Sequence, residues 1–231
     1  MIITRDAFYA QRITPRDNRL FAAQQACVSL VLADITPLAN QGIPIVLPTG
    51  PETLPLALLQ PGQGNPFGDH TPRLWKHYPF SLTQHVVGLD ADGCGQLGSV
   101  LWGDPYAPHW GDMTGHRLFE PDGQASDYLQ STLSGLREAQ QETLVTQQLV
   151  WQLHQLRVLL PDTITHSGHC WCVYRIDMDH LQTRIGASDD PMHCRLLMMA
   201  HAINDSQQSL GRSKASTWTP WTEESPTAKL G

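Results

Sequence analysis

Short apolar runs, each bounded by proline or glycine, occupy the first part of the chain and most constrain its fold. Three of them are rich in leucine or β-branched residues and are only strand-length: residues 28–32, 43–47 and 54–59. Turn-forming residues separate these runs, so the pattern predicts strands joined by tight connections. Asp34 can cap a short helix that contains Pro37 and ends at Gly42, between the first two strands.

The middle of the chain is less regular. Residues 72–77 can form a helical turn that must end before Pro79, because the residue ahead of a proline avoids the α region. A further strand is expected at residues 85–89. The stretch 90–112 is rich in Gly, Pro and Trp and shows no period, so we predict a long loop with at most a short strand at 99–102.

Helical signals dominate the second half. Ser126 is a good helix cap, and leucines recur at helical spacing through residue 160, with a slip in register between Gln140 and Val145. The slip leaves two alternatives open, one kinked helix or an antiparallel pair. Residues 170–177 read as another strand, and Asp190-Pro191 begins a second amphipathic helix.

Strands that precede helices in this way predict an α+β fold. We expect a mixed or antiparallel sheet, covered on one face by helices at residues 127–160 and 191–210. Residues 1–210 would form a single domain. Residues 211–231 are rich in Ser, Thr, Pro and Lys, which predicts a flexible, disordered tail.

Charge and hydropathy exclude several classes of protein. The net charge is −7, and 15 Lys and Arg are spread along the chain without a basic cluster, which argues against nucleic-acid binding. No apolar stretch reaches the roughly 18–20 residues of a membrane-spanning helix. Arg5 and Asp6 interrupt any secretory signal, so we expect a cytoplasmic protein with no membrane insertion. Its five cysteines are then expected to be reduced thiols.

The densest group of metal-type ligands lies in and before the 170–177 strand. The weak metal candidates are His166, His169, Cys170, Cys172, His193 and Cys194. Zinc accepts these atom types, but structural zinc sites pair ligands two to four residues apart on a turn, and Cys-x-Cys within a strand does not. Buried thiols that act as small hydrophobic groups are the favoured interpretation.

Motifs for catalysis are missing from the sequence. It contains no Gly-x-Ser-x-Gly nucleophile elbow, and its glycine-rich stretch at residues 93–98 lacks the helix and acidic residue of a dinucleotide site. We therefore expect no cofactor, and we favour a protein without catalytic activity over an enzyme.

Aromatic residues are more informative about function than the metal-type ligands or the catalytic motifs. They crowd residues 75–80 and 102–110, beside histidines and few charges, and large rigid rings of this kind favour a peptide-binding groove. Tyr78 and Phe80 could instead belong to the core. Two tryptophans in the tail either fold back on the domain or form a docking motif for another protein. The candidate binding residues are Trp75, His77, Tyr78, Trp102, Tyr106, His109, Trp110, Trp218 and Trp221.

Two segments carry a family resemblance. Residues 73–80 read Arg-Leu-Trp-Lys-His-Tyr-Pro-Phe, and residues 115–123 read Gly-His-Arg-Leu-Phe-Glu-Pro-Asp-Gly before a long helix that would end in Leu159-Leu160-Pro161. Further matches by order and spacing lie at residues 43–47, 54–59 and 62–67. Together these elements resemble the bacterial SapC family over about residues 20–210.

The resemblance implies an accessory role in modifying peptides or proteins, because SapC members occur beside tryptophan-halogenase-like flavoenzymes, cupin-type oxygenases and TonB-dependent receptors. We expect a non-catalytic protein that binds a peptide or protein substrate, a partner modifying enzyme, or both. A flavin-dependent halogenase-like enzyme or a cupin-type oxygenase is the partner the resemblance suggests. The alternatives are a surface-layer-associated structural protein, after the family name, and a metalloprotein that uses the His and Cys residues above.

Overall fold

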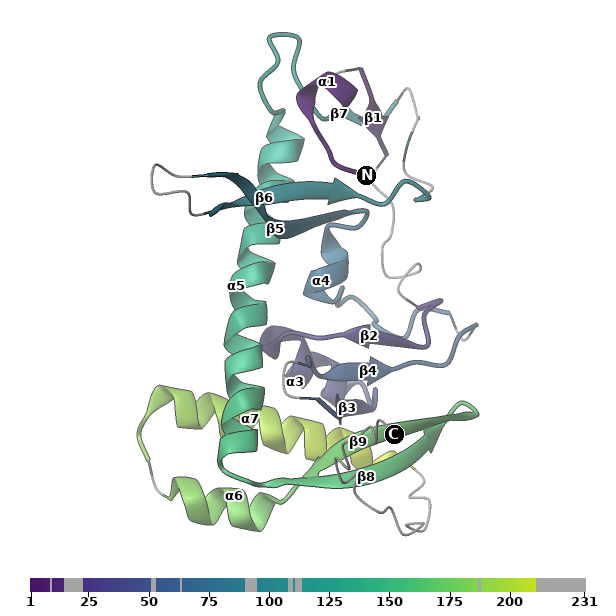
Figure 1. Cartoon of the computed structure of the whole chain (residues 1–231). Helices are drawn as coiled ribbons and strands as arrows, with labels where there is room; N and C mark the ends of the chain where they lie inside the picture. Colours follow the sequence, from purple (N-terminus) through teal and green to yellow (C-terminus); the bar gives the residue numbers. More distant parts are fainter. Residues whose placement is uncertain are drawn as a thin grey trace, which may run out of the picture.

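The protein is built from a five-stranded sheet, a separate two-stranded hairpin and one long helix that runs alongside both (Figure 1). The computed structural model describes residues 1–8, 10–14, 23–50, 53–62, 64–89, 95–107, 110, 114–186 and 188–210. The expected α+β class is confirmed, with antiparallel sheets and helices in the C-terminal half. The tail predicted at 211–231 lies outside the described residues.

The five-stranded sheet joins strands from both halves of the chain. Its members are β2 (Cys27–Ser29), β3 (Ile45–Pro48), β4 (Leu56–Leu58), β8 (Leu159–His166) and β9 (His169–Ile176). They are ordered β2-β4-β3-β9-β8, and every neighbouring pair is antiparallel. The link between the two halves is β3 against β9, where Leu47 lies opposite Tyr174.

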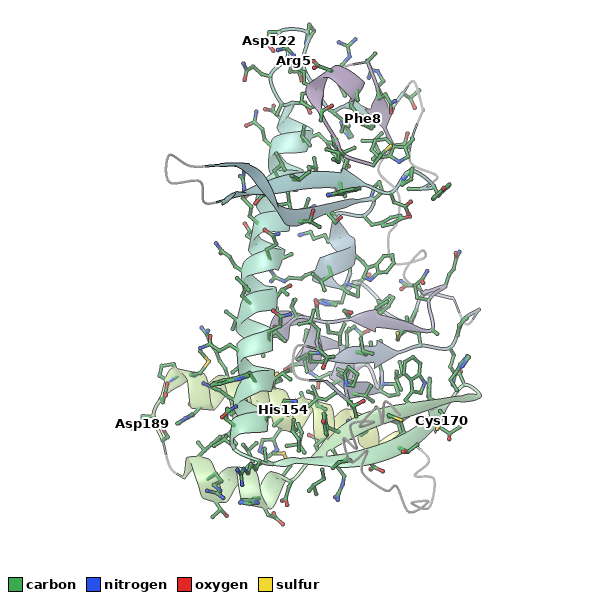
Figure 2. The ribbon with its side chains drawn as sticks, in the orientation of Figure 1. Arg5, Phe8, Asp122, His154, Cys170 and Asp189 are labelled. Atoms are coloured by element: carbon green, nitrogen blue, oxygen red, sulfur yellow. The ribbon has the colours of Figure 1, made fainter. Side chains whose placement is uncertain are left out.

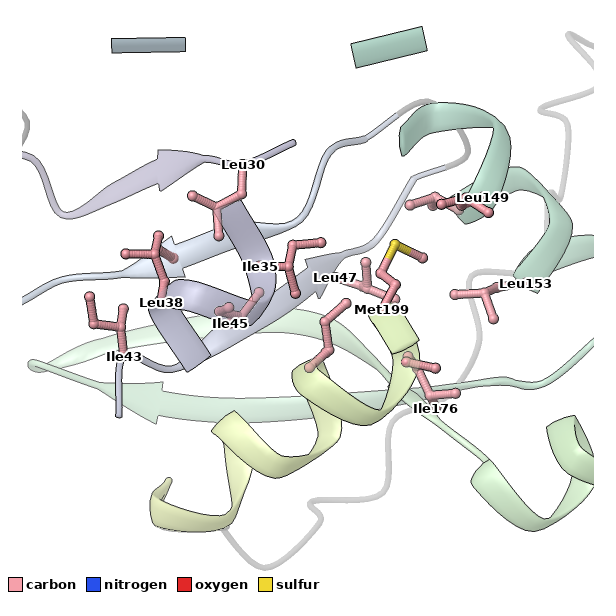
Figure 3. Packing of buried hydrophobic residues seen from close by; sticks show 14 of the residues in the cluster. Leu30, Ile35, Leu38, Ile43, Ile45, Leu47, Leu149, Leu153, Ile176 and Met199 are labelled. Atoms are coloured by element: carbon pink, nitrogen blue, oxygen red, sulfur yellow. The ribbon is translucent and has the colours of Figure 1, made fainter. Parts of the chain in front are cut away.

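Helices cover one face of this sheet, as the sequence predicted. They are α3 (Leu32–Asn40), α5 (Asp127–Gln155) and α7 (Pro191–Ser206), and α6 (Met178–Ile185) packs against α7. Figure 3 shows the side chains that meet between sheet and helices, among them Ile45, Leu47 and Met199. Next to this core, the backbone N of Ile45 in β3 donates a hydrogen bond to Ser206 Oγ of α7 at 3.0 Å, which ties the sheet to the helix.

One continuous helix of 29 residues, α5, resolves the two alternatives for the middle of the chain. Ser126 is its N-cap, as predicted, and its Oγ accepts from Leu129 N at 3.2 Å. The predicted end at residue 160 is wrong, because α5 ends at Gln155 and residues 159–166 form β8. Arg157, two residues beyond this end, has a left-handed φ of 55°, which terminates the helix, and Pro161 favours extended backbone at Leu160.

The predicted loop at residues 90–112 is also wrong in part. β6 (Gly95–Gly103) pairs with β5 (Phe80–Leu89) in a long antiparallel hairpin, so most of this stretch that the structure describes is strand. Glycines at both ends of β6 hide the strand from a search for periodicity. The hairpin, with α1 (Arg5–Phe8), β1 (Arg12–Ile13) and β7 (His116–Arg117), encloses a second apolar cluster that includes Phe8, Phe80 and Leu136.

The long helix contributes to both clusters. Leu129 and Leu136 near its start pack with the hairpin cluster, whereas Leu149 and Leu153 near its end pack with the sheet cluster. At 1.5 Å per residue α5 is about 43 Å long, which is enough to reach from one cluster to the other. No helix in the described part of the chain has the length and apolar character needed to span a membrane.

Candidate functional site

An apolar, aromatic groove lies where α4 (Arg73–Lys76) leads into β5, beside the end of β6. Its volume is about 520 Å³. Aromatic rings and prolines dominate the walls, and the lining includes Trp75, Tyr78, Pro79, Trp102, Asp104 and Pro105. Three of the residues predicted from sequence as binding residues, Trp75, Tyr78 and Trp102, therefore meet in one groove. We refer to it below as the aromatic groove.

Asp104 organises one side of the aromatic groove. Its Oδ2 accepts a hydrogen bond from Tyr78 Oη at 2.6 Å, and its Oδ1 accepts from Tyr106 N at 2.9 Å. Its backbone carbonyl accepts from Trp110 Nε1 at 2.6 Å. A single aspartate thus holds the side chains of Tyr78 and Trp110 and the backbone of Tyr106.

The hydrogen bond between Tyr78 and Asp104 shifts the pKa of both side chains. Burial, followed by the hydrogen bond and the charge of Asp104, raises the pKa of Tyr78. The same hydrogen bond, with that from Tyr106 N, lowers the pKa of Asp104. At neutral pH the phenol therefore stays protonated and the carboxylate stays ionised, which preserves the donor and the acceptor.

Trp75 stands next to Tyr78 on the groove wall. The ring centroids of the two residues are 5.5 Å apart and their planes are tilted by 32°. Trp75 also packs against the large sheet-and-helix cluster, so its ring is held from behind. A wall fixed in this way loses little entropy when a ligand binds.

Asp34 anchors the helix that carries Trp75. This carboxylate is fully buried, and it accepts from His70 Nε2 at 2.8 Å and from Arg73 N at 3.1 Å. It also accepts from Val31 N at 3.3 Å, so it serves α3 as its third residue and not as the N-cap that the sequence suggested. Burial raises the pKa of Asp34, although its hydrogen bonds oppose this effect.

His77 does not line the aromatic groove and lies against Gly135 of α5. A methyl group at Gly135 would overlap the His77 ring, so the glycine permits this close approach. Burial, then the charge of Lys76, lowers the pKa of His77. The small polar hollow beside it, of about 250 Å³, has Arg73, Lys76 and His77 on one wall.

A second apolar hollow adjoins the aromatic groove. It has a volume of about 550 Å³, lies between β5 and α5, and shares Leu74, Phe80 and Ser81 with the groove. At its far end Leu144 is 66% exposed. The two hollows together offer apolar surface on both sides of the Phe80 backbone.

The remaining aromatic candidates have different surroundings. Trp110 packs against Phe8 and Phe80, with ring centroids 5.5 and 5.7 Å away, so it belongs to the hairpin cluster and does not stand free in a loop. Figure 2 shows Phe8 in this part of the molecule. Tyr106 is 92% exposed beside the groove. His109, Trp218 and Trp221 lie outside the described residues.

The metal candidates are dispersed over two places. His166, His169, Cys170 and Cys172 lie at the free end of the β8–β9 hairpin, where Figure 2 labels Cys170. His193 and Cys194 belong to α7, and His193 Nδ1 lies 2.9 Å from Ser188 Oγ. Within the described ranges, no group of three or more His, Cys, Asp or Glu side chains could hold a metal ion.

Sequence reasoning missed Asp104 and the anchoring role of Asp34. Asp104 lies in a Gly-Asp-Pro turn next to the tryptophans, and this turn was the available signal. Nothing in the sequence pairs it with Tyr78, which precedes it by 26 residues.

The fold and the groove define an α+β protein in which Trp75, Tyr78 and Trp102 line one aromatic, apolar hollow. The family model for SapC matches residues 3–170 of the chain, and this match includes every residue named above for the aromatic groove. The chain therefore belongs to the SapC family. Searches of curated proteins and of solved structures found no match.

Proposed function

We propose that this SapC-family protein is a non-catalytic binding protein that holds a peptide segment of a substrate or partner protein in the aromatic groove. The observation that carries the proposal is the convergence of Trp75, Tyr78 and Trp102 on one groove of about 520 Å³. That volume falls within the range of ligand sites, and tryptophan and tyrosine are the residues that most often dominate binding energy.

The shape of the surface favours a chain-like ligand. The aromatic groove continues into the apolar hollow between β5 and α5 through Leu74, Phe80 and Ser81. A peptide can place one apolar side chain in each hollow, whereas a compact small molecule would fill only one of them. Asp104 at the rim provides a carboxylate that can accept from a peptide N–H or from a basic side chain.

The polar groups of the groove support binding more than catalysis. Among the described residues that line the groove there is no histidine or cysteine. Its two titratable side chains, Tyr78 and Asp104, are hydrogen-bonded to each other. A nucleophile would need a base within hydrogen-bond reach. The proposed role is therefore to present a peptide to an enzyme, and a flavin-dependent halogenase-like enzyme or a cupin-type oxygenase is the proposed partner.

A displayed library of random linear peptides, selected on the immobilised full-length protein, tests the binding role. The selected peptides should share aromatic or aliphatic residues. Trp102→Ala should weaken their binding by about 2 kcal/mol, or roughly thirtyfold, because it removes an anchor ring. Thr83→Arg, at an exposed position on the groove wall, should block binding without disturbing the core.

Trp151→Ala is the matched control, since Trp151 is a 53% exposed tryptophan on α5 and does not line the groove. The Trp151→Ala variant should bind the selected peptides with the same affinity as the wild type. Equal binding by the wild type, Trp102→Ala and Thr83→Arg would refute the groove as the binding site. The partner is tested separately by mixing the protein with a purified flavin-dependent halogenase or cupin-type oxygenase and measuring complex formation by size-exclusion chromatography.

A further inference from the structure

The β5–β6 hairpin crosses α5 apart from the five-stranded sheet and has two outer edges (Figure 1). The start of the chain covers the outer edge of β6, because Ile3 N donates to Leu101 O at 2.8 Å and Gly103 N donates to the Met1 carbonyl at the same distance. Among the described residues, the one strand that pairs with β5 is β6. We call the other side of β5 its outer edge. An unpaired sheet edge is a template for pairing with another extended chain.

The hydrogen bonds of β6 show which residues of β5 face this edge. In an antiparallel pair, residues that bond across to the partner strand alternate with residues whose N–H and C=O point outwards. Leu101 and Gly103 direct these groups to the start of the chain, away from β5. Their partners on β5, Leu82 and Phe80, therefore direct theirs to the outer edge. Leu82 is thus a residue at which a further strand would pair.

A side-chain amide already occupies this pairing position. Gln140 Nε2, from α5, donates to Leu82 O at 3.1 Å. The donor is an amide N–H, so it makes the same contact that the backbone of a neighbouring strand would make. A peptide N–H that displaced Gln140 would replace one amide–carbonyl hydrogen bond by another, at little net cost.

The two apolar hollows lie on opposite faces of β5. Leu82 lines the hollow of about 550 Å³ between β5 and α5, which we call the α5-side hollow, whereas Thr83 lines the aromatic groove. Successive residues of a strand point to opposite faces, which explains this division. A strand added to the outer edge would alternate in the same way. Its consecutive side chains would therefore enter the two hollows in turn.

We propose that the bound peptide segment pairs as a further strand with the outer edge of β5, displaces Gln140 from Leu82 O, and places two consecutive apolar side chains in the α5-side hollow and the aromatic groove. This inference rests on the proposed function of the groove and adds the conformation and sequence class of the ligand. Main-chain hydrogen bonds supply affinity in such strand addition, and the hollows supply selectivity. A helical peptide does not fit this role, because its backbone groups are bonded internally.

The backbone of a peptide selected from the displayed library tests the pairing. Each residue of its binding segment is replaced in turn by the N-methyl form, which removes one N–H donor. Only every second N–H of an added strand points to β5. The affinity for the full-length protein, measured by isothermal titration calorimetry, should therefore fall by about tenfold or more at alternate positions and by less than about threefold at the positions between them.

Gln140→Met tests the displacement from the side of the protein. The variant keeps the length of the side chain and removes the amide, so a peptide N–H no longer competes for Leu82 O. The affinity for the selected peptides should rise by about fivefold. Gln141→Met is the matched control, because Gln141 lines the same hollow and this variant leaves the contact between Gln140 and Leu82 intact. It should change the affinity by less than about twofold.

The outcomes separate this inference from the proposed function. A uniform N-methyl scan, with binding still weakened by Trp102→Ala, would overturn the strand pairing and keep the aromatic groove as the peptide site. Equal affinities of the wild type and Gln140→Met would contradict the displacement of Gln140. A library that yields no peptide would remove both proposals. Dimerisation of Gln140→Met in sedimentation velocity, without peptide binding, would assign the edge to a second copy of this chain.

Discussion

Tyr78 Oη lies 2.6 Å from Asp104 Oδ2. Tyr78 comes two residues before β5 and Asp104 directly follows β6, so this hydrogen bond joins the two strands at one end. It closes the open end of the hairpin and sets one wall of the aromatic groove. Because Asp104 also accepts from Tyr106 N and, through its carbonyl, from Trp110 Nε1, its position fixes the Tyr78 and Trp110 rings and the backbone of Tyr106.

Tyr78→Phe removes this hydrogen bond and keeps the ring. It should lower the free energy of unfolding by about 1 kcal/mol, the usual net value of one intramolecular hydrogen bond. Chemical denaturation at neutral pH measures this difference. Tyr106→Phe, at a side chain that is 92% exposed, should stay within about 0.5 kcal/mol of the wild type, and an equal loss in both variants would contradict the assignment.

The same contact predicts a pH dependence. The pKa of Tyr78 is raised by burial and by Asp104, so the folded state holds this proton more tightly than the unfolded state. Its contribution to stability is therefore fully present below the unfolded pKa of about 10 and is lost as the pH rises through the folded pKa. The difference in unfolding free energy between the wild type and Tyr78→Phe should be smaller at about pH 11 than at about pH 8. A difference that grows with pH would be inconsistent with a raised pKa.

Trp110 is expected to behave as a core residue. Trp110→Ala should lower the free energy of unfolding by about 3 kcal/mol, because it removes ring contacts with Phe8 and Phe80 and leaves a cavity. Trp151→Ala, at an exposed position on α5, should cost less than about 0.5 kcal/mol. Chemical denaturation curves for both variants test this prediction. Similar denaturation midpoints for Trp110→Ala and Trp151→Ala would show that Trp110 is not a core residue.

The strands and helices were predictable where local chemistry determines them. Ser126 caps α5 as expected, and the runs around Ile45 and Leu56 are strands because their residues are apolar and bounded by turns. Strand β6 was missed since its pairing with β5, and not its own periodicity, stabilises it. Strand β8 was read as the end of a helix because Leu159 and Leu160 continue the leucine spacing, although Pro161 favours extended backbone.

The candidate site was predictable as a set of residues but not as a geometry. Sequence spacing put Trp75 and Tyr78 in one segment and Trp102 in another, and only the hairpin register brings them together. Trp110 has the same composition around it as Trp102, yet it packs in the hairpin cluster. Whether an aromatic side chain lines a groove or fills a core depends on contacts between distant segments, and a single sequence does not contain that information.

Asp34 should be more important for stability than its place in a short helix suggests. Asp34→Ala leaves the half-buried Arg73 N–H and His70 ring without their acceptor, and should cost roughly 2 kcal/mol. Asp34→Asn keeps one acceptor oxygen and should cost less. Urea denaturation gives both values, and a loss below about 0.5 kcal/mol for the alanine variant would show that α4 is fixed by other contacts.

Gly135 permits the contact between α5 and His77. In an ordinary helix position, Gly→Ala stabilises by up to about 1 kcal/mol. At Gly135 the added methyl group would overlap the His77 ring, so Gly135→Ala should instead destabilise by about 1–3 kcal/mol, and it should weaken peptide binding because α4 carries the groove wall. In a His77→Ala background the overlap is absent, and the same substitution should become neutral or stabilising. Unfolding free energies of the four proteins in this double-mutant cycle measure the reversal of sign, and equal effects of Gly135→Ala in both backgrounds would show that His77 and Gly135 are not in contact.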